Sequence, residues 1–193
     1  MKNNKGFTII ELIITIFILS VAIIGVYNAF ATMVVLTSNA SNRLMAAYLA
    51  QEGMEVVRNI RDTNWLKIAE GSDPDVEWTD GLLDCSAGDG GCQADYKTDG
   101  TTFSPLISYG GGGDYLRIDS NGFYSYSTGT DTKFKRKIII TPPSNPNDYI
   151  MNVSVQVIWR EKSTILNPAG EEGSITVEEN LYNWYKKYFN EQQ

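Results

Sequence analysis

The apolar residues of this chain are concentrated near its N-terminus. Between Phe7 and Leu36 the only charged side chain is Glu11. A helix over these residues is about 45 Å long at 1.5 Å per residue, which exceeds the roughly 30 Å hydrocarbon core of a bilayer. Residues 7–36 are therefore predicted to form a helix that can cross a membrane.

After residue 36 the pattern becomes amphipathic with helical spacing. Polar and apolar positions separate on two sides of a helix that is predicted to continue to about Thr63. The segment 37–64 is thus expected to extend the helix beyond the membrane and to cover a head domain with its apolar side. That side consists of Leu49, Gly53, Val56, Val57 and Ile60, and the polar side of Glu52, Glu55, Asn59 and Asp62.

Individual positions of this helix carry finer predictions. Spacings of three and four residues favour pairing of Arg58 with Glu55 and with Asp62. Gly25 and Gly53 lower the helix propensity and are the predicted points of bending or close packing.

The C-terminal half alternates with period two, which is typical of half-buried strands. A hairpin is predicted across residues 119–122, because their Asn-Gly sequence favours tight turns. Further strands are predicted near 134–140, 151–159 and 175–181. The expected fold class is α+β: the long N-terminal helix packs on an antiparallel sheet of four or five strands, and residues 65–193 form a globular head.

The head begins with a long segment, 65–114, that is rich in Gly, Asp and Ser and is predicted to be a loop with one short element at most. The glycine run 110–113 lacks the Lys-Ser/Thr of a phosphate-binding loop, which disfavours nucleotide binding. Acidic residues offer oxygen ligands, but their spacing fits no EF-hand, so a solvated loop is favoured over a calcium site. These acids are Asp73, Asp75, Asp80, Asp84, Asp89 and Asp95.

Cys85 and Cys92 flank a Ser-Ala-Gly-Asp-Gly-Gly segment, which is flexible enough to bring two sulfur atoms within disulfide distance. A zinc site needs more ligands than two cysteines in a chain without histidine. We therefore predict a disulfide in a head that faces an oxidising compartment. Closing so short a loop contributes about 2 to 3 kcal/mol.

Composition narrows the function further. The 193 residues carry a net charge of −7, which argues against a generally basic nucleic-acid surface. A local basic cluster alternates along a predicted strand, so a solvated face is favoured over phosphate contact. The cluster consists of Lys133, Lys135, Arg136 and Lys137.

The aromatic tail that follows the last strand is expected to close the edge of the core, with a sugar-binding or partner surface as the alternative. Its residues are Tyr182, Trp184, Tyr185 and Tyr188.

Nothing in the sequence predicts an enzyme. The absence of histidine excludes imidazole metal sites and histidine-based triads. Paired carboxylates such as Glu171 and Glu172 are adjacent in sequence and are expected to face solvent, with no nucleophile beside a base. No catalytic, metal or cofactor-binding residue is predicted, and no specific nucleic acid or small molecule.

The charges around the apolar segment indicate how it sits in a membrane. Lys2 and Lys5 precede it and no basic residue follows until Arg43, which places the N-terminus in the cytoplasm and the head outside. A secretory signal peptide has a shorter apolar core and no carboxylate in it. A plain membrane anchor does not account for Glu11, because a carboxylate within a span is costly and marks a function.

Residues 5–12, Lys-Gly-Phe-Thr-Ile-Ile-Glu-Leu, resemble the class III leader junction of type IV prepilins and pseudopilins. The resemblance implies that residues 1–6 are a leader, that a prepilin peptidase cuts between Gly6 and Phe7, that Phe7 is N-methylated and that Glu11 serves in assembly. Cleavage creates an α-ammonium group one helical turn from Glu11. Its pairing with Glu11 of a neighbouring subunit would set the axial register of a filament.

The resemblance therefore implies a structural subunit of a type IV pilus or pilus-like filament in the cytoplasmic membrane and then in an envelope or extracellular fibre. Its expected partners are other pilin subunits of the same or different kind, the prepilin peptidase and methylase, the assembly platform and the membrane. Two alternatives stay open. One is a pseudopilin of a type II secretion or DNA-uptake system, and the other a membrane-anchored adhesin or binding module that never polymerises.

Overall fold

One long helix, α1 (Ile9–Glu70), leads into an antiparallel β-structure in the computed structural model. The structure describes residues 6, 8–71, 75–98, 106–144, 149–161 and 172–184. It divides the chain into two units, Met1–Ser41 and Asn42–Gln193, and α1 contributes residues to both.

Helix α1 runs without interruption through Gly25 and Gly53. It ends about two turns later than the predicted end near Thr63. The reason is that Asn64 and Trp65 are buried in the second unit, where the Asn64 side chain donates a hydrogen bond to the Asp80 carbonyl at 2.9 Å. The helix stops where Gly71 adopts a left-handed conformation with φ of 62°.

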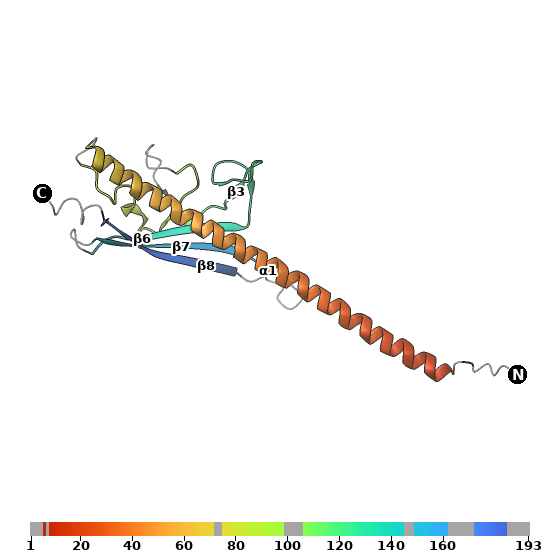
Figure 1. Cartoon of the computed structure of the whole chain (residues 1–193). Coiled ribbons are helices and arrows are strands. Elements are labelled where there is room, and N and C mark those ends of the chain that lie inside the picture. The colour runs from red at the N-terminus through yellow and green to blue at the C-terminus, as the bar shows by residue number, and fades with distance from the viewer. Residues whose placement is uncertain are drawn as a thin grey trace. The chain divides into compact units, whose positions relative to one another are not determined.

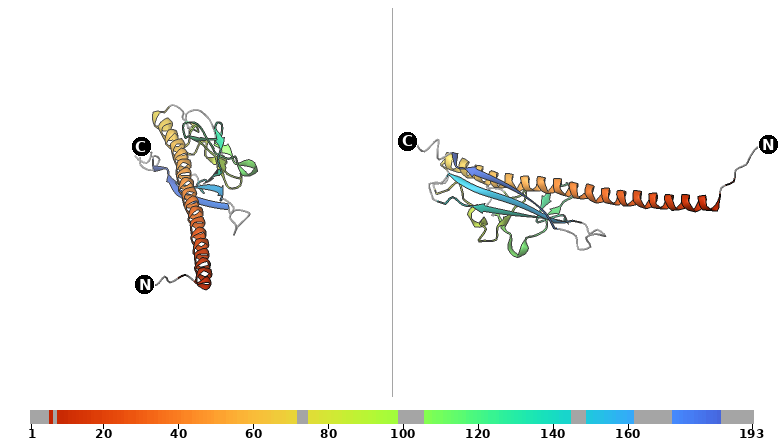
Figure 2. Two further views of the ribbon diagram at one scale, coloured as in Figure 1. Left: turned by 90° about the vertical axis from the view of Figure 1, so that its right-hand side faces the viewer. Right: turned by 90° about the horizontal axis from the view of Figure 1, so that it is seen from below.

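The main sheet has five strands, and every pair in it is antiparallel. The C-terminal part of α1 crosses one face of this sheet (Figures 1 and 2). This arrangement confirms the predicted α+β class and the three long strands. The order is β2 (Ile107–Ser108), β1 (Cys92–Gln93), β6 (Phe134–Thr141), β7 (Ile150–Arg160) and β8 (Glu172–Tyr182).

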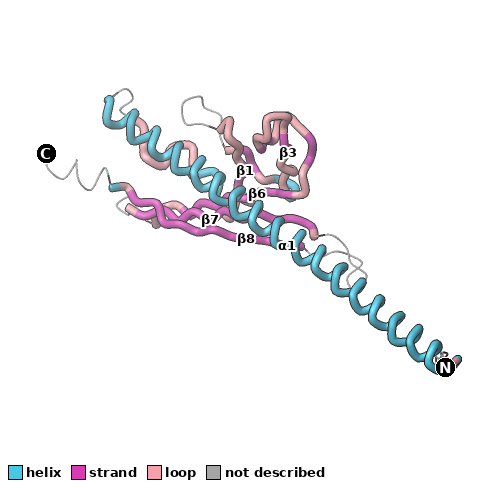
Figure 3. Tube along the Cα trace, turned by 45° about the vertical axis from the view of Figure 1, so that its right-hand side comes forward, coloured by secondary structure: helices cyan, strands magenta, loops and turns pink. Residues whose placement is uncertain are grey.

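A second, smaller sheet contains the predicted hairpin. Its strands are β4 (Tyr124–Ser125), β3 (Arg117–Ile118) and β5 (Thr130–Asp131), and Gly122 has the positive φ that the turn requires. Figure 3 shows β3 away from the main sheet, so the hairpin adds no strand there. The main sheet is instead completed by β1 and β2, which belong to the segment 65–114 that was predicted to be a loop. The same segment also forms two single turns, η1 (Leu83–Cys85) and η2 (Gly110–Gly112).

The core of the second unit lies between α1 and the sheet. All five positions predicted for the apolar side of α1 are buried, together with alternate residues of β6 and β7. Arg58 pairs with Glu55 as predicted, and its second partner is Glu179 on β8 rather than Asp62. The Arg58–Glu179 pair joins the helix to the edge strand β8, and hydrogen bonding to Glu179 raises the pKa of Arg58. Asp62 instead pairs with Arg61.

Arg136 overturns one expectation, because it is wholly buried and not part of a solvated basic face. It lies on the inner side of β6, where its guanidinium donates to the carbonyl oxygens of Leu49 on α1, at 2.8 Å, and of Ala94. Glu52, half-buried on α1, lies 3.4 Å away. A charged residue therefore joins helix, sheet and connecting segment at the centre of the core.

Gly53 is packed directly against this arginine. A Cβ atom at Gly53 would lie 2.8 Å from the Arg136 Cδ and 3.0 Å from a Val155 methyl group. Because the guanidinium is held at its far end, Gly53→Ala is expected to lower the free energy of unfolding by about 1 to 2 kcal/mol, even with alanine's higher helix propensity. Denaturant unfolding of the full chain in micelles measures this. Gly25→Ala, which meets no atom within 4 Å, is the matched control and should show no loss.

The structure contains a disulfide between Cys85 and Cys92, with the two Cα atoms 5.1 Å apart and both residues buried. It closes the loop that leads from η1 into β1 and so fixes the start of β1, which lies between β2 and β6 in the sheet. We expect the double substitution Cys85→Ala and Cys92→Ala to lower the free energy of unfolding by about 2 to 3 kcal/mol. Reductant should have the same effect on the wild type and none on the double variant. Equal stability of wild type with and without reductant would contradict this role.

Candidate processing and assembly site

The start of α1 is organised by Thr8. The Thr8 Oγ1 accepts a hydrogen bond from the backbone N–H of Glu11 at 3.3 Å, and the Thr8 carbonyl accepts one from Leu12 at 3.2 Å. Thr8 is therefore the N-cap residue, and Glu11 occupies the third position of the helix. The cap satisfies one of the backbone N–H groups that a helix leaves unpaired at its N-terminus.

The capping role of Thr8 was not predicted from the sequence, although the sequence contains a signal for it. The sequence Thr8-Ile9-Ile10-Glu11 has the Ser/Thr-x-x-Glu spacing of a capping box. In a capping box the hydroxyl accepts a hydrogen bond from the backbone N–H of the glutamate, and the carboxylate accepts one from the backbone N–H of the Ser or Thr. A carboxylate in the first turn is also favoured by the helix dipole. Glu11, the residue predicted to serve in assembly, thus lies in the first turn, where the helix dipole favours a negative charge.

The predicted site residues are only partly described by the structure. Gly6 is exposed, as is Glu11, which makes no ion pair among the described residues. Phe7, the residue predicted to become the methylated N-terminus, lies outside the described residues, as do residues 1–5. The exposed carboxylate of Glu11 is therefore available to a group from another chain.

The helix around the site has an apolar surface with no cover in the single chain. Every described residue from Thr8 to Val34 is exposed, and the exposed fraction of large apolar side chains reaches 80% at Ile9. This part of α1 is long and apolar enough to cross a membrane. So large an apolar surface requires lipid or protein around it.

Four hydroxyl groups within this surface are satisfied by the helix itself. The hydroxyl groups of Thr15, Ser20, Thr32 and Thr37 donate to backbone carbonyl oxygens three or four residues earlier, at 2.8 to 3.0 Å. Such bonds remove the cost of placing a hydroxyl in a medium without water. Glu11 is the one charged side chain of this surface, and its carboxylate has no ion-pair partner among the described residues.

Two other sites are alternatives on the sequence alone, a cation site in the acidic segment and a binding surface on the aromatic tail. No group of three or more acidic or cysteine side chains gathers as a metal site among the described residues; Asp73 lies outside them. Asp95 is buried and accepts hydrogen bonds from the backbone N–H groups of Lys97 and Tyr126, so it holds the small sheet against the connecting segment. In the aromatic tail, Trp184 packs edge-on against Trp65 at 4.6 Å between ring centroids. Tyr185 and Tyr188 lie outside the described residues.

Comparison with known proteins agrees with the resemblance at the N-terminus. Residues 1–27 match a family model described as the prokaryotic N-terminal methylation motif. No curated protein and no solved structure gave a significant match. The match includes Gly6, Phe7, Thr8 and Glu11 and ends within the apolar part of α1. At its N-terminus, therefore, this chain carries the methylation motif that is the class III signal of type IV pilins and pseudopilins.

Proposed function

We propose that this protein is a structural subunit of a type IV pilus or pilus-like filament, cut after Gly6, methylated on Phe7 and assembled through residues 7–36. The methylation motif is the observation that carries the proposal. The fold supports it, since an exposed apolar helix precedes a head whose own core is complete. The motif indicates a structural subunit rather than an enzyme.

In the membrane, Lys2 and Lys5 hold the N-terminus on the cytoplasmic side and the head lies outside. Removal of residues 1–6 exposes the α-ammonium group of Phe7. When subunits associate, apolar surfaces leave lipid for one another without contacting water. The ammonium group of one chain pairs with Glu11 of its neighbour, which selects one axial register. Head-to-tail contacts of this kind do not close and so give a fibre.

The test is the intact mass and N-terminal sequence of protein recovered from membranes and from sheared surface fibres. We expect a chain that begins at Phe7 and carries one added methyl group, present in both fractions. A chain that still begins at Met1, or that is cut within the apolar segment, would overturn the proposal in favour of a membrane anchor or secreted module.

Recovery of the same mature chain from membranes but never from a surface fibre would favour the pseudopilin alternative. A pseudopilin shares the leader, the methylated residue and the glutamate. It differs in forming a short fibre that stays in the cell envelope. Electron microscopy of sheared material, with antibody against the head, separates the two outcomes.

A further inference from the structure

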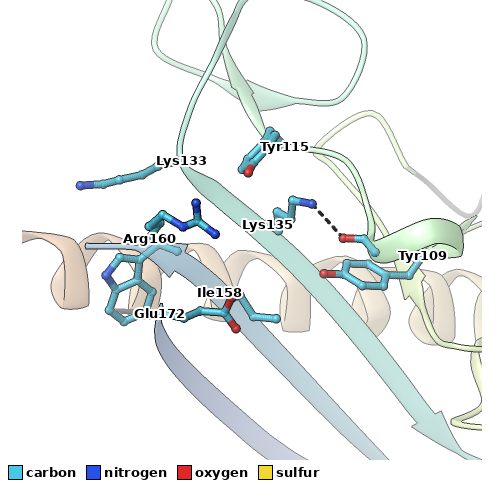
Figure 4. A pocket seen from close by; sticks show the side chains of 9 residues that line it. Tyr109, Tyr115, Lys133, Lys135, Ile158, Arg160 and Glu172 are labelled. Carbon is cyan, nitrogen blue, oxygen red and sulfur yellow. Dashed lines mark hydrogen bonds between the residues drawn. The ribbon is translucent and has the colours of Figure 1, made fainter. Parts of the chain in front are cut away.

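The head contains a cavity of about 310 Å³ that is unrelated to the assembly site. Four segments meet there: the residues around η2, the first half of β6, the end of β7 and the start of β8 (Figure 4). Its volume lies at the lower end of the range of small-molecule sites. The side chains that matter for its chemistry are Tyr109, Tyr115, Lys135, Arg160 and Glu172.

One cation of this cavity, Lys135, is held in place by contacts, whereas Arg160 is exposed. The Lys135 ammonium donates to the Gly112 carbonyl at 3.0 Å and lies 4.6 Å from the centroid of the Tyr115 ring. Two of its three N–H donors remain for a ligand. Arg160 makes no ion pair among the described residues, although Glu172 is its direct cross-strand neighbour. In a chain of net charge −7, three cations (Lys133, Lys135 and Arg160) and a single acid line this cavity, and the Lys133 ammonium already donates to the Asn42 side chain. Lys135 and Arg160 therefore form a local anion site.

Uncharged groups complete the lining. Tyr115 is half exposed and offers a ring face, whereas Tyr109 is buried. Burial raises the pKa of the Tyr109 hydroxyl and the nearby Glu172 carboxylate raises it further, so this hydroxyl keeps its proton and can donate. Figure 4 shows the Tyr109 hydroxyl end and the Arg160 guanidinium turned toward the same space. Trp159 also lines the cavity, but its buried side chain lies on the core side of β7, where its ring packs against Phe134.

This combination selects a ligand chemistry. Arg160 and Lys135 suit a carboxylate or phosphate, since charge-assisted hydrogen bonds to a cationic donor are the strong ones. Glu172 repels a second negative charge but accepts hydrogen bonds from hydroxyl groups. The exposed ring of Tyr115 suits the apolar face of a sugar ring. A molecule with one negative charge, several hydroxyls and a ring satisfies all of these groups, and a polyphosphate chain does not.

We propose that this cavity binds a sugar acid, that is, a pyranose ring bearing a carboxylate, whether free or as a unit of an acidic polysaccharide. The carboxylate lies between Arg160 and Lys135, the ring lies on Tyr115, and its hydroxyls meet Glu172 and Tyr109. This function adds a ligand to the head and does not depend on filament assembly.

Titration of the full chain with galacturonic acid and with its trimer tests the proposal, in a detergent without a sugar headgroup and with saturation-transfer NMR as the readout. We expect saturable binding at millimolar concentrations and none of the corresponding neutral galactose trimer. Arg160→Gln should weaken binding about tenfold or more, because it removes a charged hydrogen bond. Arg117→Gln, at an exposed arginine that pairs with Asp131 on the small sheet, is the matched control and should bind as the wild type.

Glu172→Gln separates a sugar acid from a polyanion. A sugar ligand loses a strong hydroxyl acceptor, so its affinity should fall by several-fold. Unchanged or tighter binding in this variant, together with tighter binding of a short oligonucleotide than of the galacturonic acid trimer, would overturn the proposal and make the cavity a phosphate contact. Absence of binding by both the acid and its trimer would overturn it outright. Preference for the trimer over the monomer would indicate a polysaccharide source.

Discussion

Arg136→Ala is expected to lower the free energy of unfolding of the head by about 3 to 5 kcal/mol. The substitution leaves the buried carbonyl of Ala94 without its donor, takes a partner from Glu52 and opens a cavity between α1 and β6. Stability depends on this position because helix, sheet and connecting segment all meet there. Denaturant unfolding of the full chain in micelles, followed by tryptophan fluorescence, measures the effect.

Two further variants make this prediction specific. Arg136→Met keeps most of the packing volume and removes the buried charge, so its loss should be clearly smaller. Arg117→Ala removes an arginine whose salt bridge to Asp131 is largely exposed and should change stability by about 1 kcal/mol or less. If Arg136→Ala cost no more than Arg117→Ala, the buried guanidinium would have no structural role.

Tyr126 lies beside Arg136, and its hydroxyl donates to the Arg136 carbonyl oxygen at 3.5 Å. Burial raises the pKa of Tyr126 to about 12. The hydroxyl is therefore neutral at physiological pH. The pKa of Tyr126 in the folded chain exceeds its ordinary value of about 10. The stability that comes from the neutral hydroxyl is thus complete below pH 10 and is lost as the pH rises toward 12. The core around Arg136 is consequently insensitive to acid on this account and sensitive only to strong alkali.

The parts of the fold that sequence predicted are those with a long repeating pattern. The helical spacing of Leu49, Val56 and Ile60 and the alternation along β6, β7 and β8 each extend over many residues, and the structure has these elements in place. Strands β1 and β2 have two residues each, too few for a period to show. They form because a disulfide and long-range pairing hold them, and neither is a local property of the chain.

Arg136 and the sugar-acid cavity show a different limit. The residues around Arg136 predict a basic strand, but the sequence does not show that Arg136 lies on the side of the sheet that faces the core. The cavity is likewise assembled from Tyr109, Lys135, Arg160 and Glu172, which belong to four segments that are distant in sequence. By contrast, the processing motif is contiguous, so sequence was sufficient to find it. Within that motif the structure adds Thr8 as the helix cap.

We expect Glu11→Gln to abolish filament formation while leaving processing intact. The substitution keeps the size of the side chain and removes its charge, so the ammonium group of a neighbouring Phe7 would be buried without a counter-ion. An unpaired buried charge costs several kcal/mol, which corresponds to at least a tenfold fall in fibre yield. The measurement compares sheared fibres with the membrane pool by immunoblot, and intact mass verifies that Phe7 is the methylated first residue.

The control for Glu11→Gln is Glu55→Gln, the same substitution at another exposed glutamate of α1. Among the described residues Glu55 pairs with Arg58 at the head surface, and the variant should assemble normally. Thr8→Ala isolates the capping role: it should cost about 1 kcal/mol at the helix start and reduce fibre yield much less, since the charge pair remains. If the Glu11→Gln variant formed fibres at the wild-type yield, the buried charge pair would play no part in assembly. Equal losses for Thr8→Ala and Glu11→Gln would instead assign the effect to the helix cap, because both residues belong to the same turn.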